Sequence, residues 1–237
     1  FDASGGITLL SGAMDHGQGH GTTFKQVLAD RLGIDGDGIT YRFGDTDKVA
    51  TGVGTFNARC AVFVGSAVVN AAEKIVEKGK RIAAHLLEAA DADIEFANGT
   101  FTVAGTDRSI DIKAVAKAAF NKAQLPPDIE PGLYEHGEFG MGQGQAPTYP
   151  NGCHLAEVEI DVDTGKVDLV RYSAVDDAGT ILNPLLFDGQ LHGGIVQGAG
   201  QIMMEEVYYD ESGQLITGSF MDYGMPRADD FCSFDIS

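Results

Sequence analysis

Apolar residues recur along the chain at two spacings, and these spacings predict strands and helices in mixed order. In the N-terminal half, two strands are expected at 6–10 and 39–43, and each leads through a glycine-rich loop into a helix. The first helix is expected to be capped by Thr22 or Thr23 and to end at Gly33. The second should run from 59 to 90, and its first half is apolar on every face, which predicts that it is buried.

Further along the chain, hairpin signals predict antiparallel pairing. Asn98-Gly99 marks one hairpin, and residues 154–161 alternate before the turn Asp163-Thr164-Gly165, which predicts another hairpin with one solvated face. A short helix is expected over 112–120, a longer one over 185–206 and a last hairpin over 207–216. The pattern therefore predicts an α+β fold in two lobes with mixed or antiparallel sheets.

The boundary between the lobes is expected where the composition changes. Residues 124–152 carry five of the seven prolines and many glycines, which is typical of a linker or wrapping segment. The expected division is a first lobe over 1–123, a linker over 124–152 and a second lobe over 153–237.

Charge and composition narrow the classes of partner. With 16 Lys+Arg against 35 Asp+Glu the net charge is −19, which argues against nucleic acid and anionic membranes as main partners. No run approaches the roughly 20 apolar residues of a membrane-spanning helix. Three scattered cysteines without metal-ligand spacing suit reduced thiols, and we expect a cytoplasmic protein.

Glycine-rich loops carry the candidate chemistry. Gly17-Gln18-Gly19-His20-Gly21 and Gly189-Gln190-Leu191-His192-Gly193 share one pattern, each at the start of an expected helix, where backbone N–H groups favour an anion such as phosphate. The alternatives are that the glycines only permit tight turns and that the repetition is chance rather than duplication. Arg59, at the mouth of an apolar helix, needs a partner: either a carboxylate such as Asp45 or Asp47, or a bound phosphate.

Taken together, these stretches resemble the molybdenum-binding subunit of the xanthine dehydrogenase family of molybdenum hydroxylases, which includes aldehyde oxidases and the carbon monoxide dehydrogenase large subunit. The resemblance covers nearly the whole chain and lies in residues 17–20 with 22–23, 44–47, 54–59, 154–159, 183–198 and 218–223.

The resemblance implies molybdopterin with molybdenum, in its cytosine dinucleotide form in bacterial members. It assigns no catalytic residue or metal ligand here, and it implies these cofactor-binding residues: Gln18, Gly19, His20, Thr22, Asn57, Arg59, Cys60 and Gln190. The implied activity is oxidation of a small molecule, by hydroxylation of an aldehyde or N-heterocycle or by oxidation of CO. Electrons would pass to iron–sulfur and FAD subunits in a dimer of heteromers, alongside the remainder of the molybdenum subunit.

The chain also departs from the family pattern. Gly21 stands where many relatives have Glu, and Ala58 where Ser is common. The family's catalytic Glu lies in a Gly-x-Gly-Glu segment downstream of Phe-Met-Asp-Tyr, and the chain stops at Ser237 before such a segment. We therefore expect a fragment or one chain of a split subunit, inactive by itself. The alternative is a non-catalytic nucleotide-binding, anion-binding or assembly module.

Overall fold

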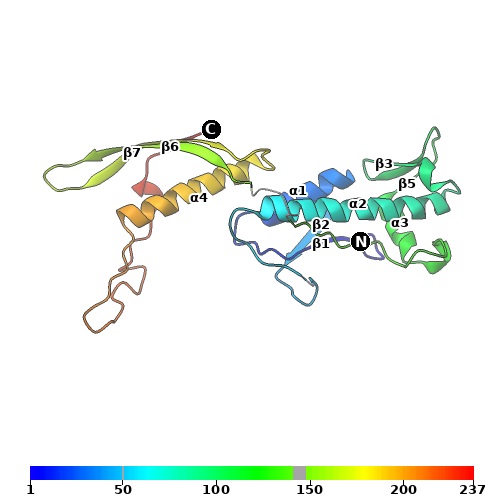
Figure 1. Cartoon of the computed structure of the whole chain (residues 1–237), viewed down its shortest axis with the longest axis horizontal. Coiled ribbons are helices and arrows are strands. Elements are labelled where there is room, and N and C mark those ends of the chain that lie inside the picture. The colour runs from blue at the N-terminus through cyan, green and yellow to red at the C-terminus, as the bar shows by residue number, and fades with distance from the viewer. Residues whose placement is uncertain (50, 141–147) are drawn as a thin grey trace. The chain divides into compact units, whose positions relative to one another are not determined.

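The computed structural model describes residues 1–49, 51–140 and 148–237, and it contains two compact units. The first unit is Phe1–Pro147 and the second is Thr148–Ser237, and each is described by itself (Figure 1). Within the described ranges, every helix is too short or too polar to cross a membrane.

A parallel strand pair opens the first unit. Strands β1 (Ile7–Ser11) and β2 (Ile39–Phe43) pair from Ile7↔Ile39 to Ser11↔Phe43, and helix α1 (His20–Leu32) connects them, with the short 3₁₀ turn η1 (Gly36–Gly38) before β2. Both strands and the end of α1 at Gly33 are confirmed, but the parallel pairing was not predicted. Because the strands are parallel, the loops that follow them leave from the same edge of the sheet.

Helix α2 (Cys60–Leu86) is the longest element of this unit. Its 27 residues span about 40 Å, and it packs against α1 and α3 (Figure 1). The residues that it buries along its middle recur at helical spacing: Gly65, Val68, Ala72, Ile75, Gly79 and Ile82. The expectation that its first half is buried on every face is wrong in this chain, because Val62 is 42% exposed. Its neighbours cover one stripe of the helix and leave the opposite face open.

A small antiparallel sheet covers the far end of α2. It contains β3 (Ile94–Ala97), β4 (Thr100–Val103) and β5 (Ser109–Asp111), with η2 (Asp91–Asp93) before it and α3 (Ile112–Ala119) after it. The expected Asn98-Gly99 turn is confirmed, with φ of 47° and 73° at its two residues. Phe101 of β4 is fully buried against Gly79 of α2, so this sheet belongs to the main core.

The proline-rich stretch continues the first unit after η3 (Lys122–Gln124). Leu125, Ile129 and Leu133 are buried in the same core as α2, and the His136 carbonyl accepts a hydrogen bond of 2.8 Å from Lys74 Nζ. Residues 125–136 of this stretch therefore pack along the first unit, whereas residues 148–152 belong to the second. Residues 141–147 of the expected linker lie outside the described residues.

The second unit is a β-ribbon beside one helix. Strand β6 (Asn151–Ile160) pairs antiparallel with β7 (Val167–Asp177), and β8 (Phe234–Ile236), which follows η4 (Ala228–Asp230), adds a parallel strand to β7. Helix α4 (Pro184–Met203) is capped by Asn183. The hairpin is confirmed, and the expected hairpin over 207–216 is reduced to a single bridge, Tyr209↔Leu215.

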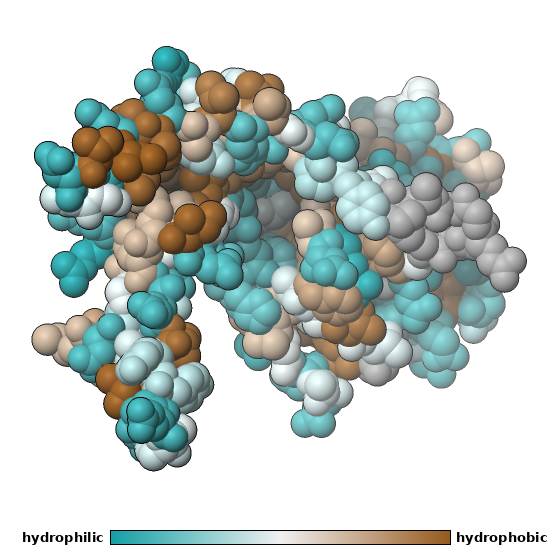
Figure 2. Space-filling model, turned by 60° about the vertical axis from the view of Figure 1, so that its left-hand side comes forward, coloured by the Kyte–Doolittle hydropathy of each residue, from teal (hydrophilic) through white to brown (hydrophobic). Residues whose placement is uncertain are grey.

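This second unit buries little apolar surface. Every residue of β6 is exposed, so the expectation of only one solvated face is wrong for this strand. Among the described residues of the unit, only Ala174 and Ile195 are buried apolar side chains. Figure 2 shows apolar side chains, in brown, open to solvent on the face that it presents. Taken whole, the two units mix small parallel and antiparallel sheets with helices, as the α+β prediction requires.

Candidate functional site

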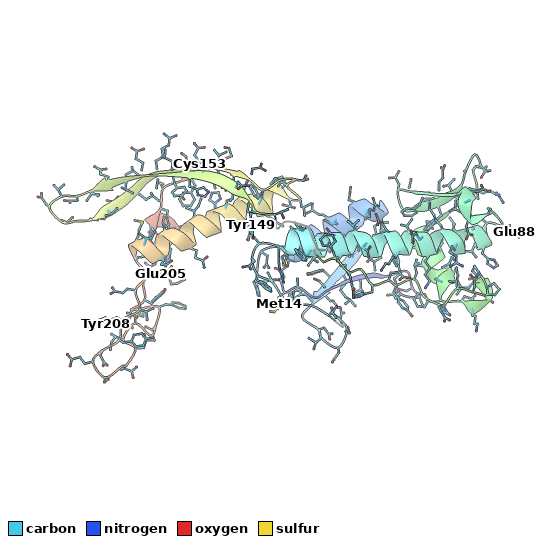
Figure 3. The ribbon with its side chains drawn as sticks, in the orientation of Figure 1. Met14, Glu88, Tyr149, Cys153, Glu205 and Tyr208 are labelled. Atoms are coloured by element: carbon cyan, nitrogen blue, oxygen red, sulfur yellow. The ribbon has the colours of Figure 1, made fainter. Side chains whose placement is uncertain are left out.

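Two loops meet at the carboxyl edge of the β1–β2 pair. The loop over 12–19 leads into α1, and the loop over 44–59 leads into α2. Their backbones touch, since a Cβ built on Gly12 would lie 2.8 Å from the Cα of Gly52. Thr55 Oγ1 also donates a hydrogen bond of 2.6 Å to the Met14 carbonyl. Figure 3 labels Met14 beside the first turn of α2 and Glu88 at the helix's opposite end.

The start of α1 is held by a carboxylate from upstream in the chain. Asp15 accepts hydrogen bonds from the backbone N–H groups of Gly17 and Gly21, both at 3.0 Å. The N-cap residue is Gly19, with a left-handed φ of 80°, so the expected cap at Thr22 or Thr23 is wrong. A left-handed N-cap without a side chain needs an acceptor from elsewhere, and Asp15 supplies it.

Gln18 lies inside the first loop rather than extending freely from it. Its Oε1 accepts from the His16 N–H, and its Nε2 donates to the Met14 carbonyl at 3.2 Å. A Gln side chain has two N–H donors and two acceptor lone pairs. One N–H and one lone pair of Gln18 therefore remain for a ligand.

His20 is the buried polar side chain of this edge. It is 7% exposed, it packs against Phe24 at a centroid distance of 4.8 Å, and its Nδ1 has no hydrogen-bond partner. Burial lowers the pKa of the imidazole, against the opposing effects of the Asp15 charge and a hydrogen bond with the Met14 carbonyl. A neutral ring that donates to that carbonyl has an unprotonated acceptor at Nδ1. The Tyr41 hydroxyl is a second buried polar atom without a partner in this region.

The start of α2 has a different character, because no side chain caps it. Asn57 and Ala58 precede it with positive φ values of 56° and 49°, a conformation that costs non-glycine residues energy and that clusters at functional sites. Arg59 follows, and its Cζ lies 3.8 Å from the centroid of the Phe56 ring and 5.3 Å from that of Phe63. The N-cap residue of α2 thus carries a guanidinium, at a helix start that no side chain caps.

The partner of Arg59 was left open between a carboxylate and a phosphate. In the described part of the chain no carboxylate pairs with it. Asp45 instead forms an exposed ion pair of 3.2 Å with Lys48, so the interpretation of Asp45 as the partner of Arg59 is wrong. Lys48 is three residues along the same turn, which makes it the nearer cation.

Cys60 connects α2 to the first loop. Its buried thiol donates to Thr55 Oγ1 at 3.6 Å, and Thr55 in turn donates to the Met14 carbonyl. All three cysteines are free. Among the described residues, no cluster of His, Cys, Asp or Glu side chains is arranged to hold a metal ion.

The structure brings most of the sequence-predicted site residues to one edge, and these are Gln18, Gly19, His20, Thr22, Asn57, Arg59 and Cys60. Gln190 is different: it is exposed on α4 in the second unit. It was expected at a helix start, but α4 begins at Pro184, so Gln190 lies inside the helix. The two glycine-rich stretches therefore have different structures.

Three residues of this edge were missed in the sequence: Asp15, Tyr41 and Thr55. Asp15 stands two residues before a glycine, which is the signature of an Asx turn and could have identified it. Thr55 stands in the 54–59 stretch of the resemblance, but its hydrogen bond to the other loop could not be read from the sequence, and neither could the burial of the Tyr41 hydroxyl.

Comparison with known proteins finds matches to one family along nearly the whole chain. Residues 1–232 match the family model of the molybdopterin cofactor-binding domain. The carbon monoxide dehydrogenase large chain of Afipia carboxidovorans is 38% identical over 226 residues, which are 95% of this chain and 27% of the relative. The nicotine 6-hydroxylase large subunit of Paenarthrobacter nicotinovorans is 39% identical over 239 residues, which are 100% of this chain and 29% of the relative.

Solved structures also superpose on the whole chain. A crystal structure of Cu,Mo-CO dehydrogenase superposes with a TM-score of 0.86 at 36% identity, over 100% of this chain and 29% of that chain. Quinoline 2-oxidoreductase from Pseudomonas putida 86 superposes with a TM-score of 0.82 at 36% identity, over 100% of this chain and 30% of that one. The chain thus spans less than a third of each of these relatives.

Proposed function

Because this chain belongs to the molybdopterin cofactor-binding domain family, we propose that the β1–β2 edge holds the phosphate-bearing part of the molybdenum cofactor in a molybdenum hydroxylase. The single observation that carries the proposal is the start of α2, where no side chain caps the helix and the guanidinium of its N-cap residue, Arg59, has no carboxylate partner in the described chain.

The phosphate contact follows from the physical chemistry of that turn. An uncapped helix start has unpaired N–H donors and a partial positive charge, and both favour an anion. The guanidinium adds donors in a planar fork that suits phosphate oxygens. Its stacking on Phe56 holds the guanidinium against an aromatic ring.

The remaining contacts suit a heterocyclic ring. His20 Nδ1 is a buried acceptor without a donor, and because protein atoms cover it, a ligand N–H satisfies it only once the covering loop moves aside. The spare N–H and lone pair of Gln18 can pair with an amide-like edge of a ring. A pterin presents such an edge, so the residues present fit molybdopterin, and Thr22, Asn57, Cys60 and Gln190 are proposed as further contacts. We propose the cytosine dinucleotide form, whose added phosphate is a further negative charge for Arg59 to bind.

The activity and partners belong to the same proposal. Bound molybdenum would supply the redox centre at which a small molecule is oxidised. The named relatives act on carbon monoxide, nicotine and quinoline, and we propose CO, an aldehyde or an N-heterocycle as the substrate here. The proposed partners are the remainder of the molybdenum subunit and the iron–sulfur and FAD subunits, assembled as a dimer of heteromers in the cytoplasm.

The test compares two arginine variants of the protein purified from a molybdenum-replete host. Arg59→Gln removes the proposed phosphate contact, and we expect molybdenum and pterin content to fall and the affinity for inorganic pyrophosphate to drop about 10- to 100-fold. Arg31→Gln is the control. Arg31 lies in the last turn of α1, where it forms an exposed ion pair with Glu73 of α2. Cofactor content that is unchanged in Arg59→Gln would contradict the proposal. Pyrophosphate binding without any molybdenum or pterin would favour a non-catalytic anion-binding module.

A further inference from the structure

The two helices that begin at the β1–β2 edge differ in what satisfies their first N–H groups. In α1, the Gly21 N–H donates to Asp15, and those of Thr22 and Thr23 donate to the Gly19 carbonyl at 3.1 and 3.0 Å. In α2, the N–H groups of its first turn find no acceptor within the described chain, and the first bond is Phe63 N–H to the Arg59 carbonyl. One helix start is therefore closed and the other is open.

Asp15, the residue that occupies the start of α1, carries a negative charge, which an ordinary helix cap does not require. A Ser or Asn at the cap position accepts from a helix-start N–H without a charge, through one oxygen. Burial alone would raise the pKa of Asp15, but the N–H groups of Gly21 and Gly17 outweigh it, so its pKa lies below the usual value and the carboxylate is ionised at neutral pH. A phosphate approaching this helix start would meet an anion of its own sign.

We propose that Asp15 is a specificity-determining residue that closes the start of α1 to phosphate and thereby directs the phosphates of the ligand to α2. This inference rests on the proposed function, because it concerns the orientation of the same ligand. The glycine-rich loop then serves as a rigid support for Gln18 and His20 rather than as an anion cradle. The ligand lies with its phosphates toward Arg59 and its uncharged N–H groups toward His20.

The geometry of the loop agrees with this division. Gly17 and Gly19 have positive φ values of 102° and 80°, and together they fold the loop so that one carboxylate reaches the N–H groups of Gly17 and Gly21. Asp15 is thus built into the loop at no further entropy cost, whereas a free phosphate would have to displace it. Since the bound carboxylate already occupies these donors, ligand phosphate cannot share them.

The experiment measures the affinity for inorganic pyrophosphate by calorimetry in the 237-residue chain and its variants. In Asp15→Ala the N–H groups of Gly17 and Gly21 become free, so we expect Asp15→Ala/Arg59→Gln to bind pyrophosphate about tenfold more tightly than Arg59→Gln alone. Equal affinity in these two proteins, with helix content retained by circular dichroism, would overturn the role of Asp15.

A second variant keeps the test decisive if Asp15→Ala loses its helix content. Asp15→Asn retains one acceptor oxygen and removes the charge, and we expect Asp15→Asn/Arg59→Gln to bind pyrophosphate about threefold more tightly than Arg59→Gln. No gain there would also overturn the inference. The failure of the proposed function looks different: Arg59→Gln would then bind pyrophosphate as the wild-type chain does. If the wild-type chain binds none, binding gained in Asp15→Ala still supports the inference, and its absence overturns it.

Discussion

Two glycines of α2 provide a matched test of how the first unit is packed. Both Gly65 and Gly79 are buried in the same helix, but their surroundings differ. A Cβ on Gly79 would lie 2.4 Å from Cζ of Phe101, whereas a Cβ on Gly65 would have no neighbour within 4 Å. Replacing each by Ala therefore adds the same methyl group to a full site and to an empty one.

The expected magnitudes follow from two opposing effects. Ala is favoured over Gly in a helix by about 0.8–1 kcal/mol, and this gain is common to both variants. In Gly79→Ala the ring of Phe101 must move by about 1 Å to restore normal contact distances. That ring is fully buried and stacks on Phe96 at 4.6 Å, so we expect an overpacking penalty of about 1–3 kcal/mol.

The measurement is the free energy of unfolding in urea, followed by far-ultraviolet circular dichroism. Gly65→Ala should be more stable than the wild-type chain by up to about 1 kcal/mol, and Gly79→Ala should be less stable than Gly65→Ala by about 1–3 kcal/mol. Because helix propensity cancels between the two variants, the difference reports the contact with Phe101. Equal stability of the two variants would refute the packing of β4 on α2.

Three further predictions concern the loops and the second unit. Thr55→Val removes the hydrogen bond to the Met14 carbonyl, and we expect the free energy of unfolding in urea to fall by about 1 kcal/mol and pyrophosphate binding to weaken. Because burial lowers the pKa of His20, the unfolded chain binds the proton more readily, and unfolding measured in urea should become easier as pH falls below about 6.5. This loss should be smaller in His20→Gln. Amide hydrogen exchange measured by mass spectrometry should be faster in β6, where every residue is exposed, than in β1 and α2.

Each of these predictions has its own control. Thr40→Val, on an exposed position of β2, makes the same chemical change as Thr55→Val without removing the contact between the loops, and equal effects of the two would count against that contact. A pH dependence that is the same in His20→Gln and in the wild-type chain would show that other groups cause it. Protection of β6 equal to that of β1 would mean that the second unit is better covered than its exposed side chains indicate.

The local patterns of the sequence were sufficient for most elements. The residue pattern predicted β1 and β2, and alternation with the turn Asp163-Thr164-Gly165 predicted the β6–β7 hairpin. Asn98-Gly99 predicted the turn between β3 and β4, and Gly33 predicted the end of α1. These signals act between residues that are close in the chain, so a single sequence contains them. The candidate site was also partly predictable, because Gln18 and Arg59 stand next to helix starts that the pattern locates.

Other features depend on residues that are distant in the sequence. The parallel pairing of β1 with β2 brings the two loops to one edge, and the alternation of a strand is the same for either direction of pairing. The contact between Thr55 and Met14 joins residues 41 positions apart. The partner of Arg59 was undecidable from the sequence, because several acidic residues lie within reach of a flexible loop.

The sequence by itself determined the family, the order of elements and most of the residues at the β1–β2 edge, since glycine turns and helical periodicity are local properties. Tertiary structure decided what those residues can do. Only in the fold does Asp15 occupy the start of α1, while the start of α2 remains open beside Arg59. Only there does burial leave His20 Nδ1 without a partner. The physical reason is that desolvation and hydrogen-bond satisfaction depend on which groups surround an atom, and those groups come from distant parts of the chain.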